Sequence, residues 1–197
     1  MRKYTYLAAF AIIAAMLLGM GGAYAATPLL ITNVGQGAES AMVNTLCKMN
    51  KITADLKDTV TADELADAAG KAKYSFMAVV VGYSGKGMGA AGVNLEQELA
   101  RANSVLKKAQ ALKIPVIIMH IGGFERRGAN SDPIIKEVFK YANHAIFVAS
   151  GNYADAVAFE NKKPDNLLNN SLPKGVTPKI VDKISGIVAP LKEIMGL

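Results

Sequence analysis

The chain has 197 residues, of which 51% are hydrophobic and 19% are charged, and its formal net charge is +6. Its single cysteine, Cys47, excludes an intramolecular disulfide, so a hydrophobic core has to stabilise the fold. The basic residues are scattered and do not cluster with aromatic side chains, so nucleic acid is not an expected partner, whereas a modest positive charge suits small anionic molecules.

The first 25 residues have the pattern of a secretory signal peptide. Residues 2–3 are basic, residues 7–20 form an apolar run, and Ala23-Tyr24-Ala25 is a small-x-small cleavage site. The apolar run is shorter than the roughly 20 residues that a membrane-spanning helix requires. We therefore expect a periplasmic or secreted protein that is cleaved after Ala25 and keeps no stable membrane anchor.

Residues 26–197 are expected to form a single domain, which opens with a strand, a turn and a helix. Residues 28–34 are apolar and predict the strand, and the two glycines of residues 35–37 predict the turn. Apolar side chains at helical spacing predict a helix over residues 38–49. Residues 52–56 predict a short edge strand.

A second helix is expected from its capping signal. Thr61 followed by Glu64 matches a capping box, and Val60 and Leu65 are placed to form a hydrophobic staple around it. This pattern predicts a helix over residues 62–70.

Residues 76–94 are the stretch around which the chain is organised. Residues 76–81 form an unbroken apolar run rich in β-branched side chains, which is typical of a strand buried on both faces of a parallel sheet. Residues 82–92 contain five glycines and predict a loop that turns sharply or lets a ligand approach the backbone. Asn94, to which Gln97 can reach back, predicts the start of a long helix.

The second half of the chain continues the alternation of strand and helix. The expected elements are a strand at 115–121, a polar loop at 122–130, a helix capped by Asp132 before Pro133, a strand at 144–150, a short helix at 153–160, an irregular segment at 162–178, a short strand at 180–181 and a final helix at 184–194 with a kink or late start at Pro190. The alternation predicts an α/β fold. We expect a three-layer α/β/α domain with a mostly parallel sheet of five strands, or six if residues 180–181 pair, in the flavodoxin-like order 2-1-3-4-5.

In an open α/β sheet, ligands bind beyond the carboxyl ends of the strands, where the strand order reverses. That point is expected between the strands that end at Val34 and Val81. The predicted ligand-binding residues are Gln36, Glu39, Ser40, Ser84, Lys86, Asn94, His120, Arg126, Arg127, Ser131 and Asn152. The adjacent guanidinium groups of Arg126 and Arg127 are the strongest signal for an anion, because they can fork onto a carboxylate or phosphate. The alternative is a solvated loop in which one of these arginines pairs with Glu125 or Asp132.

Neither a nucleotide cofactor nor a metal is expected. Residues 87–92 match the G-x-G-x-x-G pattern of dinucleotide-binding turns, but they follow the wrong strand, and no acidic residue ends the next strand. His120 is the titratable group expected to change charge near neutral pH at the predicted edge. A metal site would need further ligands beside it, and only Glu39, Glu125 and Asp132 could supply them.

An enzyme is the main alternative to a binding module. Residues 82–86 are a near match to G-x-S-x-G with Ser84 at its centre. Ser84, Asp132 and His144 even have the chain order of an α/β-hydrolase triad. However, His144 opens a strand and so falls at the opposite edge of the sheet, while His120 at the correct edge precedes Asp132. A hydrolase or transferase would therefore have to use Ser84 with His120.

A protein-interaction domain is the third hypothesis. Tyr83, Met88 and Phe124 are apolar residues in otherwise small or polar turns. If they form one exposed patch, they could meet another copy of the chain or another protein of the cell envelope.

Three turns resemble those of a known family. They are TNVGQGAES at residues 32–40, VVVGYSGKGMGAAG at residues 79–92 and MHIGGFERRGANSDP at residues 119–133. They are similar to an exported bacterial family known as a domain of unknown function, and the resemblance covers nearly all of the chain after the signal peptide. It implies a periplasmic or surface α/β domain, and it implies neither a substrate nor catalytic residues. We therefore expect a non-enzymatic periplasmic module that binds a small anionic molecule.

Overall fold

The structure is a computed structural model that describes residues 28–197, so the expected signal peptide lies outside the described residues. Six parallel strands form one sheet in the order β2-β1-β3-β4-β5-β6. Their bounds are β1 Leu29–Val34, β2 Ala54–Leu56, β3 Phe76–Val81, β4 Val116–His120, β5 His144–Val148 and β6 Lys179–Val181. The flavodoxin-like order is confirmed, and β6 adds the sixth strand beside β5.

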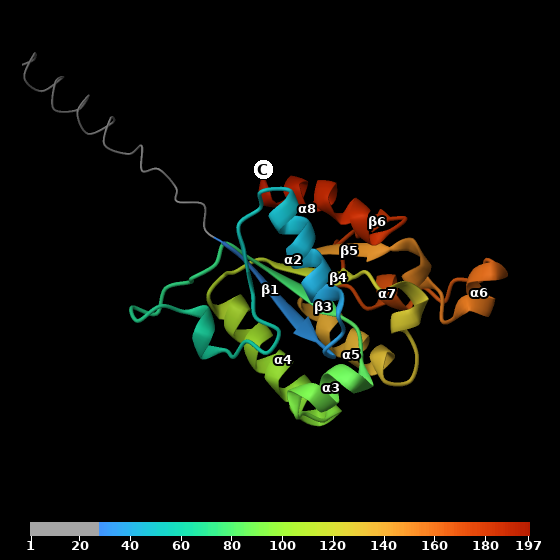
Figure 1. Cartoon of the computed structure of the whole chain (residues 1–197), viewed down its shortest axis with the longest axis horizontal. Helices are drawn as coiled ribbons and strands as arrows, with labels where there is room; N and C mark the ends of the chain where they lie inside the picture. Colours follow the sequence, from blue (N-terminus) through green and yellow to red (C-terminus); the bar gives the residue numbers. More distant parts are fainter. Residues whose placement is uncertain (1–27) are drawn as a thin grey trace, which may run out of the picture.

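Helices cover both faces of this sheet (Figure 1). The helices α2 (Glu39–Met49) and α8 (Val188–Met195) pack against one face, and α4 (Leu95–Ala111) and α5 (Ser131–Val138) pack against the other. The shorter helices are α3 (Gly85–Ala91), α6 (Ala156–Glu160) and α7 (Leu167–Asn170), and the 3-10 turns are η1 (Asp63–Leu65), η2 (Gly123–Arg126), η3 (Phe139–Tyr141), η4 (Ala149–Asn152) and η5 (Ile184–Ile187). None of the helices in residues 28–197 has the length and apolar character needed to cross a membrane.

The central strands are apolar at nearly every position because each of their faces is covered. Leu30 packs in the cluster beneath α4 and α5, whereas Leu29 and Ile31 pack in the cluster beneath α2 and α8. All three side chains have no exposed surface. A strand buried on both faces needs apolar side chains at odd and even positions, and this explains the unbroken run at residues 76–81.

The parallel register brings the carboxyl ends of three strands to one edge. Val34 at the end of β1 pairs with Val81 at the end of β3, and Val80 pairs with Met119 of β4. β2 and β3 lie on opposite sides of β1, so the strand order reverses there. The turns after β1, β3 and β4 therefore meet at the predicted switch point.

The prediction of a loop over residues 82–92 is wrong for most of its length, because residues 85–91 form α3. The Ser84 hydroxyl oxygen caps this helix by accepting a hydrogen bond from the Gly87 amide at 3.1 Å. Gly92 ends the helix in the left-handed conformation, with φ of 67°. A cap at each end offsets the poor helix propensity of the glycines between them.

The helix predicted over residues 62–70 is also wrong, because residues 63–65 form a single 3-10 turn. The Glu64 carboxylate accepts a hydrogen bond from the Thr61 amide at 2.8 Å, so half of the capping box is present. The chain then leaves the helical path because the Asp67 carboxylate accepts two later backbone amides, each at 2.9 Å. These bonds satisfy backbone groups that a continuing helix would have used.

Two helices begin at residues other than those predicted from their prolines, Pro133 and Pro190. Asp132 does not cap α5, which begins one residue earlier at Ser131. α8 begins at Val188, four residues after the predicted start at 184 and two residues before Pro190, which lies in its first turn.

Candidate functional site

Three glycines, one after each of the strands β1, β3 and β4, surround an ion pair at the carboxyl edge of the sheet. Arg126 Nε donates a hydrogen bond to Glu39 Oε1 at 2.7 Å. A Cβ at Gly122 would lie 2.2 Å from Arg126 Cγ, and a Cβ at Gly82 would lie 3.1 Å from Arg126 Cδ. A Cβ at Gly37 would lie 2.2 Å from Glu39 Oε2. The ion pair can therefore lie across these turns only because these three positions are glycines.

The guanidinium group of Arg126 is held at one nitrogen. Its side chain is 28% exposed, and that of its partner Glu39 is 11% exposed. Within residues 28–197, the two terminal nitrogens of Arg126 make no hydrogen bond. These nitrogens form a planar fork that matches the two oxygens of a carboxylate or phosphate.

The first turn of α2 lies beside this fork, since Glu39 is the first residue of the helix. The N-cap residue of α2 is Ala38, and no side chain of residues 28–197 caps this end of the helix. The unpaired N–H groups and the dipole of an 11-residue helix favour negative charge at this end. Glu39 supplies part of that charge and at the same time fixes the position of Arg126.

Ser40 lies in the same turn but is bound inside the fold. Its hydroxyl donates to Asp58 Oδ1 at 2.6 Å and accepts from Asn33 Nδ2 at 3.0 Å. Asn33 is 1% exposed, and its Oδ1 has no partner in the part of the chain that the structure describes. Ser40 therefore links α2 to β1 and to the segment after β2.

Gln36 directs the chain out of β1 with a positive φ of 58°. Its Nε2 donates to Glu98 Oε1 at 2.8 Å, and Glu98 also accepts two hydrogen bonds from Arg101, each at 2.9 Å. Burial opposes the charge on Glu98, but the hydrogen bonds and charge of Arg101 outweigh it and hold the pKa of Glu98 below its usual range. This network was not predicted, although the spacing of Glu98 and Arg101 on one helix face could have indicated the pair.

Arg127 follows Arg126 in the sequence, but its side chain is fully buried. Its guanidinium group donates to Asp132 at 2.9 Å, to Asp165 at 2.6 Å and to the carbonyl oxygen of Gly151 at 2.7 Å. The guanidinium group makes three further hydrogen bonds, one each to Asp132, Asp165 and the carbonyl oxygen of Tyr153. Every N–H of the group therefore faces a protein acceptor. We therefore assign Arg127 no ligand contact.

Partial burial raises the pKa of Asp165, but the hydrogen bonds from Arg127 outweigh this effect and hold the pKa below its usual value.

His120 is fully buried beneath the turns. Its Nδ1 lies 3.1 Å from the carbonyl oxygen of Val81, and its Nε2 lies 3.1 Å from the carbonyl oxygen of Gly123. Burial lowers the pKa of His120 to about 4, so the ring is neutral at neutral pH and donates to one of the two carbonyls. The residue joins the turns after β3 and β4 and has no surface to offer a ligand.

The other predicted residues lie at element ends. Ser84 caps α3, Asn94 caps α4 in a complete capping box, and Ser131 accepts a hydrogen bond from the amide that follows Gly82, at 3.2 Å. Lys86 is exposed on α3, and Asn152 is half-buried in η4. Of the predicted residues, the structure brings Glu39 and Arg126 together at the edge with Gln36 nearby.

The residues of the enzyme hypothesis do not form a connected group. No hydrogen bond joins Ser84, His120 and Asp132 in the described chain, because the first two bind backbone groups and Asp132 binds Arg127. Residues 28–197 also contain no group of three or more His, Cys, Asp or Glu side chains placed to hold a metal ion.

The patch required by the interaction hypothesis is not formed, since Met88 is 3% exposed. Phe124 instead belongs to a partly exposed aromatic cluster. Its ring centroid lies 5.6 Å from that of Phe159, which lies 5.1 Å from that of Tyr153. The sequence did not indicate this cluster, because Phe124 comes from η2 and Phe159 from α6, which are far apart in the chain.

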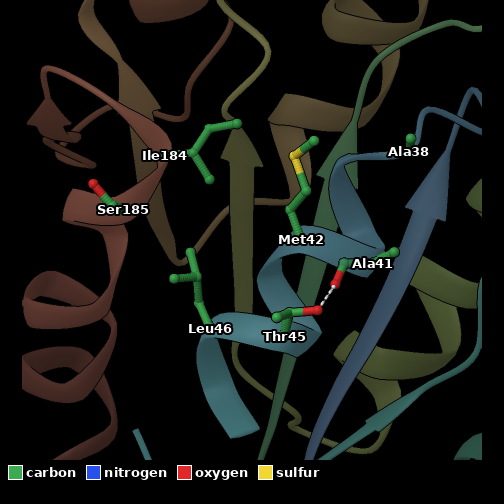
Figure 2. A pocket seen from close by; sticks show the side chains of 7 residues that line it. All are labelled: Ala38, Ala41, Met42, Thr45, Leu46, Ile184 and Ser185. Atoms are coloured by element: carbon green, nitrogen blue, oxygen red, sulfur yellow. Dashed lines mark hydrogen bonds between the residues drawn. The ribbon is translucent and has the colours of Figure 1, made fainter. Parts of the chain in front are cut away.

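A groove lies beside α2 and was not predicted from the sequence (Figure 2). Its volume is about 550 Å³. The groove is lined from α2 by Ala38, Ala41, Met42, Thr45 and Leu46, and from η5 by Ile184 and Ser185. A second hollow of about 250 Å³ lies near Pro115, at the opposite edge of the sheet.

Comparisons with known proteins give a family and no activity. A family model described as "Domain of unknown function (DUF6305)" matches residues 26–195. No curated protein matches the chain. A solved structure of a mutant of the esterase AlinE4 matches over 85% of this chain and 82% of its own, with 12% sequence identity and a TM-score of 0.31. A likeness this weak carries no argument about function.

Proposed function

The chain belongs to the family described as Domain of unknown function (DUF6305), and we propose that it is a binding module for a small anionic molecule. The ligand lies at the carboxyl edge of the sheet, between Arg126 and the first turn of α2. The observation that carries this proposal is the fork of Arg126, which makes no hydrogen bond within residues 28–197 and which Glu39 fixes over Gly37, Gly82 and Gly122.

The geometry favours an anion that presents two oxygens to the fork, such as a carboxylate or a phosphate. Glu39 takes the Nε of Arg126, so the two terminal nitrogens keep a fixed direction and can bind two oxygens at once. The N–H groups at the start of α2 add donors and partial positive charge on the adjacent side. Because the ion pair with Glu39 is nearly neutral, these helix donors supply the excess attraction for an anion.

The proposal assigns binding rather than catalysis. The Ser84 hydroxyl caps α3, and His120 is fully buried between two carbonyl oxygens. Neither Ser84 nor His120 is therefore placed to attack a molecule bound at the Arg126 fork.

We place this function outside the cytoplasm. The support is the signal-peptide pattern of residues 1–25 and the match to the family model, which begins at residue 26. Exported binding modules meet anions such as carboxylates and phosphates in the surrounding medium.

The test is a titration of the purified protein with acetate and inorganic phosphate, followed by NMR shifts of backbone amides. We expect the amides of Glu39 and Ser40 to shift on binding. Replacing Arg126 with Gln removes the fork and should weaken binding about tenfold or more, because hydrogen bonds to charged groups contribute roughly 1.5–3 kcal/mol. Arg126→Lys, which keeps the charge without the fork, should lose less.

The matched control is Lys48→Gln, which removes the same charge from the exposed far end of α2. It should leave the affinity within about twofold, since exposed charges at a distance are screened. Circular dichroism should show that all variants are folded. Equal affinities for wild type and Arg126→Gln, or no binding of either anion by wild type, would contradict the proposal.

A further inference from the structure

The groove beside α2 is apolar and offers few hydrogen-bond partners. Met42, which lines it, is 48% exposed, a large value for an apolar side chain of this size. Two residues that line the groove carry a hydroxyl group, Thr45 and Ser185. The Thr45 hydroxyl already donates a hydrogen bond within the helix, to the carbonyl oxygen of Ala41 at 2.9 Å. Such walls suit hydrocarbon rather than a sugar or a nucleotide, whose polar groups would lose their hydration without replacement.

One end of this groove is next to the first turn of α2, although neither Glu39 nor Arg126 is among the residues that line it. Ala38 lines the groove, and the next residue, Glu39, holds Arg126 at 2.7 Å. Figure 2 shows Ala38 beside the ends of the strands, with Thr45 and Leu46 further along α2. The groove therefore runs along α2 from the end of the helix that carries Glu39.

We propose that the ligand is an anionic amphiphile with one carboxylate head and an unbranched hydrocarbon chain. This inference rests on the proposed function, since the head occupies the Arg126 fork. The chain lies in the groove between α2 and η5, in contact with Met42 and Ile184. Residues 38–46 extend about 12 Å at 1.5 Å per residue, a length matched by roughly eight to ten carbons.

The size of the groove agrees with such a ligand. Small-molecule sites in proteins have volumes of roughly 300–1,000 Å³ and are mostly apolar with a few placed polar groups, and the groove of about 550 Å³ falls in this range. Here the placed polar groups are at the end, on Arg126 and the first turn of α2. A molecule that uses both parts has its charge at one end.

The test compares acetate, hexanoate and decanoate, below micelle-forming concentrations, on the purified protein by NMR or calorimetry. Each methylene that enters the groove should tighten binding by roughly two- to fourfold, since burial of one methylene in apolar surroundings contributes up to about fourfold. Met42→Glu places a charge in the groove and should weaken decanoate at least tenfold while leaving acetate within about twofold. Met49→Glu is the matched control, because Met49 is on the same helix, is 74% exposed and does not line the groove.

The outcomes separate this inference from the proposed function. If acetate and decanoate bind equally and both need Arg126, the amphiphile is wrong and the anion site stands. If decanoate binds more tightly but Met42→Glu has no effect, the chain lies elsewhere and the inference is also wrong. If neutral 1-decanol binds as tightly as decanoate and Arg126→Gln changes neither, the anion site itself is wrong.

Discussion

Gly87 and Gly89 belong to the same short helix, α3, but differ in what a side chain would meet there. A Cβ on Gly87 would lie 1.9 Å from the backbone oxygen of Gln36, whereas a Cβ on Gly89 would have no neighbouring atom within 4 Å. Gly87 is therefore needed for α3 to pack on the turn after β1. Gly89 carries only the cost of a glycine inside a helix.

We expect opposite effects from alanine at these two positions. Gly87→Ala forces α3 away from the backbone of Gln36 and should lower the free energy of unfolding by about 2 kcal/mol, in the range of overpacking. Gly89→Ala should raise it by about 0.5–1 kcal/mol, because alanine is the better helix former. Urea denaturation followed by circular dichroism measures both values. Equal effects of the two substitutions would show that Gly87 is not packed as described.

The contrast between Arg126 and Arg127 could be predicted only in part from the sequence. Both arginines follow the same strand, and the sequence left open whether both face an anion or one pairs with Glu125 or Asp132, as Arg127 does with Asp132. The partner that decides the role of Arg127 is Asp165, from a segment that the sequence marks as irregular. Long-range pairs of this kind leave no local pattern, whereas the turn that carries Arg126 follows directly from its place after β4.

Arg127 is one of the residues that attach residues 153–170, which include α6 and α7, to the sheet edge. The side chain binds Asp165 at 2.6 Å and the carbonyl oxygens of Gly151 and Tyr153. α6 has no buried residue, and Leu168 of α7 is fully buried. The segment around α6 therefore depends on polar contacts more than on a core of its own.

Replacing Arg127 with Lys should loosen this segment. Lysine keeps the charge but offers three donors from one atom, so it cannot bind two carboxylates and two carbonyls together. We expect a loss of about 2–3 kcal/mol in unfolding free energy, somewhat below the cost of removing a buried ionic partner, and faster hydrogen exchange in residues 153–170.

Arg126→Lys is the matched control for this prediction. Its ion pair is partly exposed, so the loss of stability should stay below about 1 kcal/mol and exchange in residues 153–170 should not change. Hydrogen exchange measured by mass spectrometry distinguishes the two variants. Wild-type protection of residues 153–170 in Arg127→Lys would contradict the assigned role.

Two capping boxes with the same sequence logic led to different elements. Asn94 and Gln97 start α4, a helix of 17 residues whose apolar stripe packs on the sheet. Thr61 and Glu64 start a single 3-10 turn, because the residues that follow offer no continued stripe and bond to Asp67 instead. A cap fixes where a helix can begin, and packing decides whether it continues.

At the scale of the whole molecule, the sheet was predictable and the groove was not. Burial on both faces imposes apolar side chains along whole strands, so strand positions and order are visible in the sequence. The groove has one wall from α2 and the other from η5, which are far apart in the chain. Its shape depends on how these two elements sit on the sheet, and no local sequence pattern records that.

The start of the folded chain gives a sharp test of the proposed export. β1 begins at Leu29, and its amide already bonds to the carbonyl oxygen of Thr53 at 3.0 Å. Cleavage after Ala25 leaves residues 26–28 before this strand, so the cut removes the apolar run and spares the sheet.

When the protein is expressed in a secreting bacterial host, the form recovered outside the cytoplasm should begin with Ala26, as shown by intact mass and N-terminal sequencing. Ala25→Arg should block the cut, because the peptidase requires a small side chain there, whereas Tyr24→Arg at the variable position between the two alanines should be processed normally. Full-length protein that stays in the cytoplasm, or a cut at another position, would refute the assigned signal peptide.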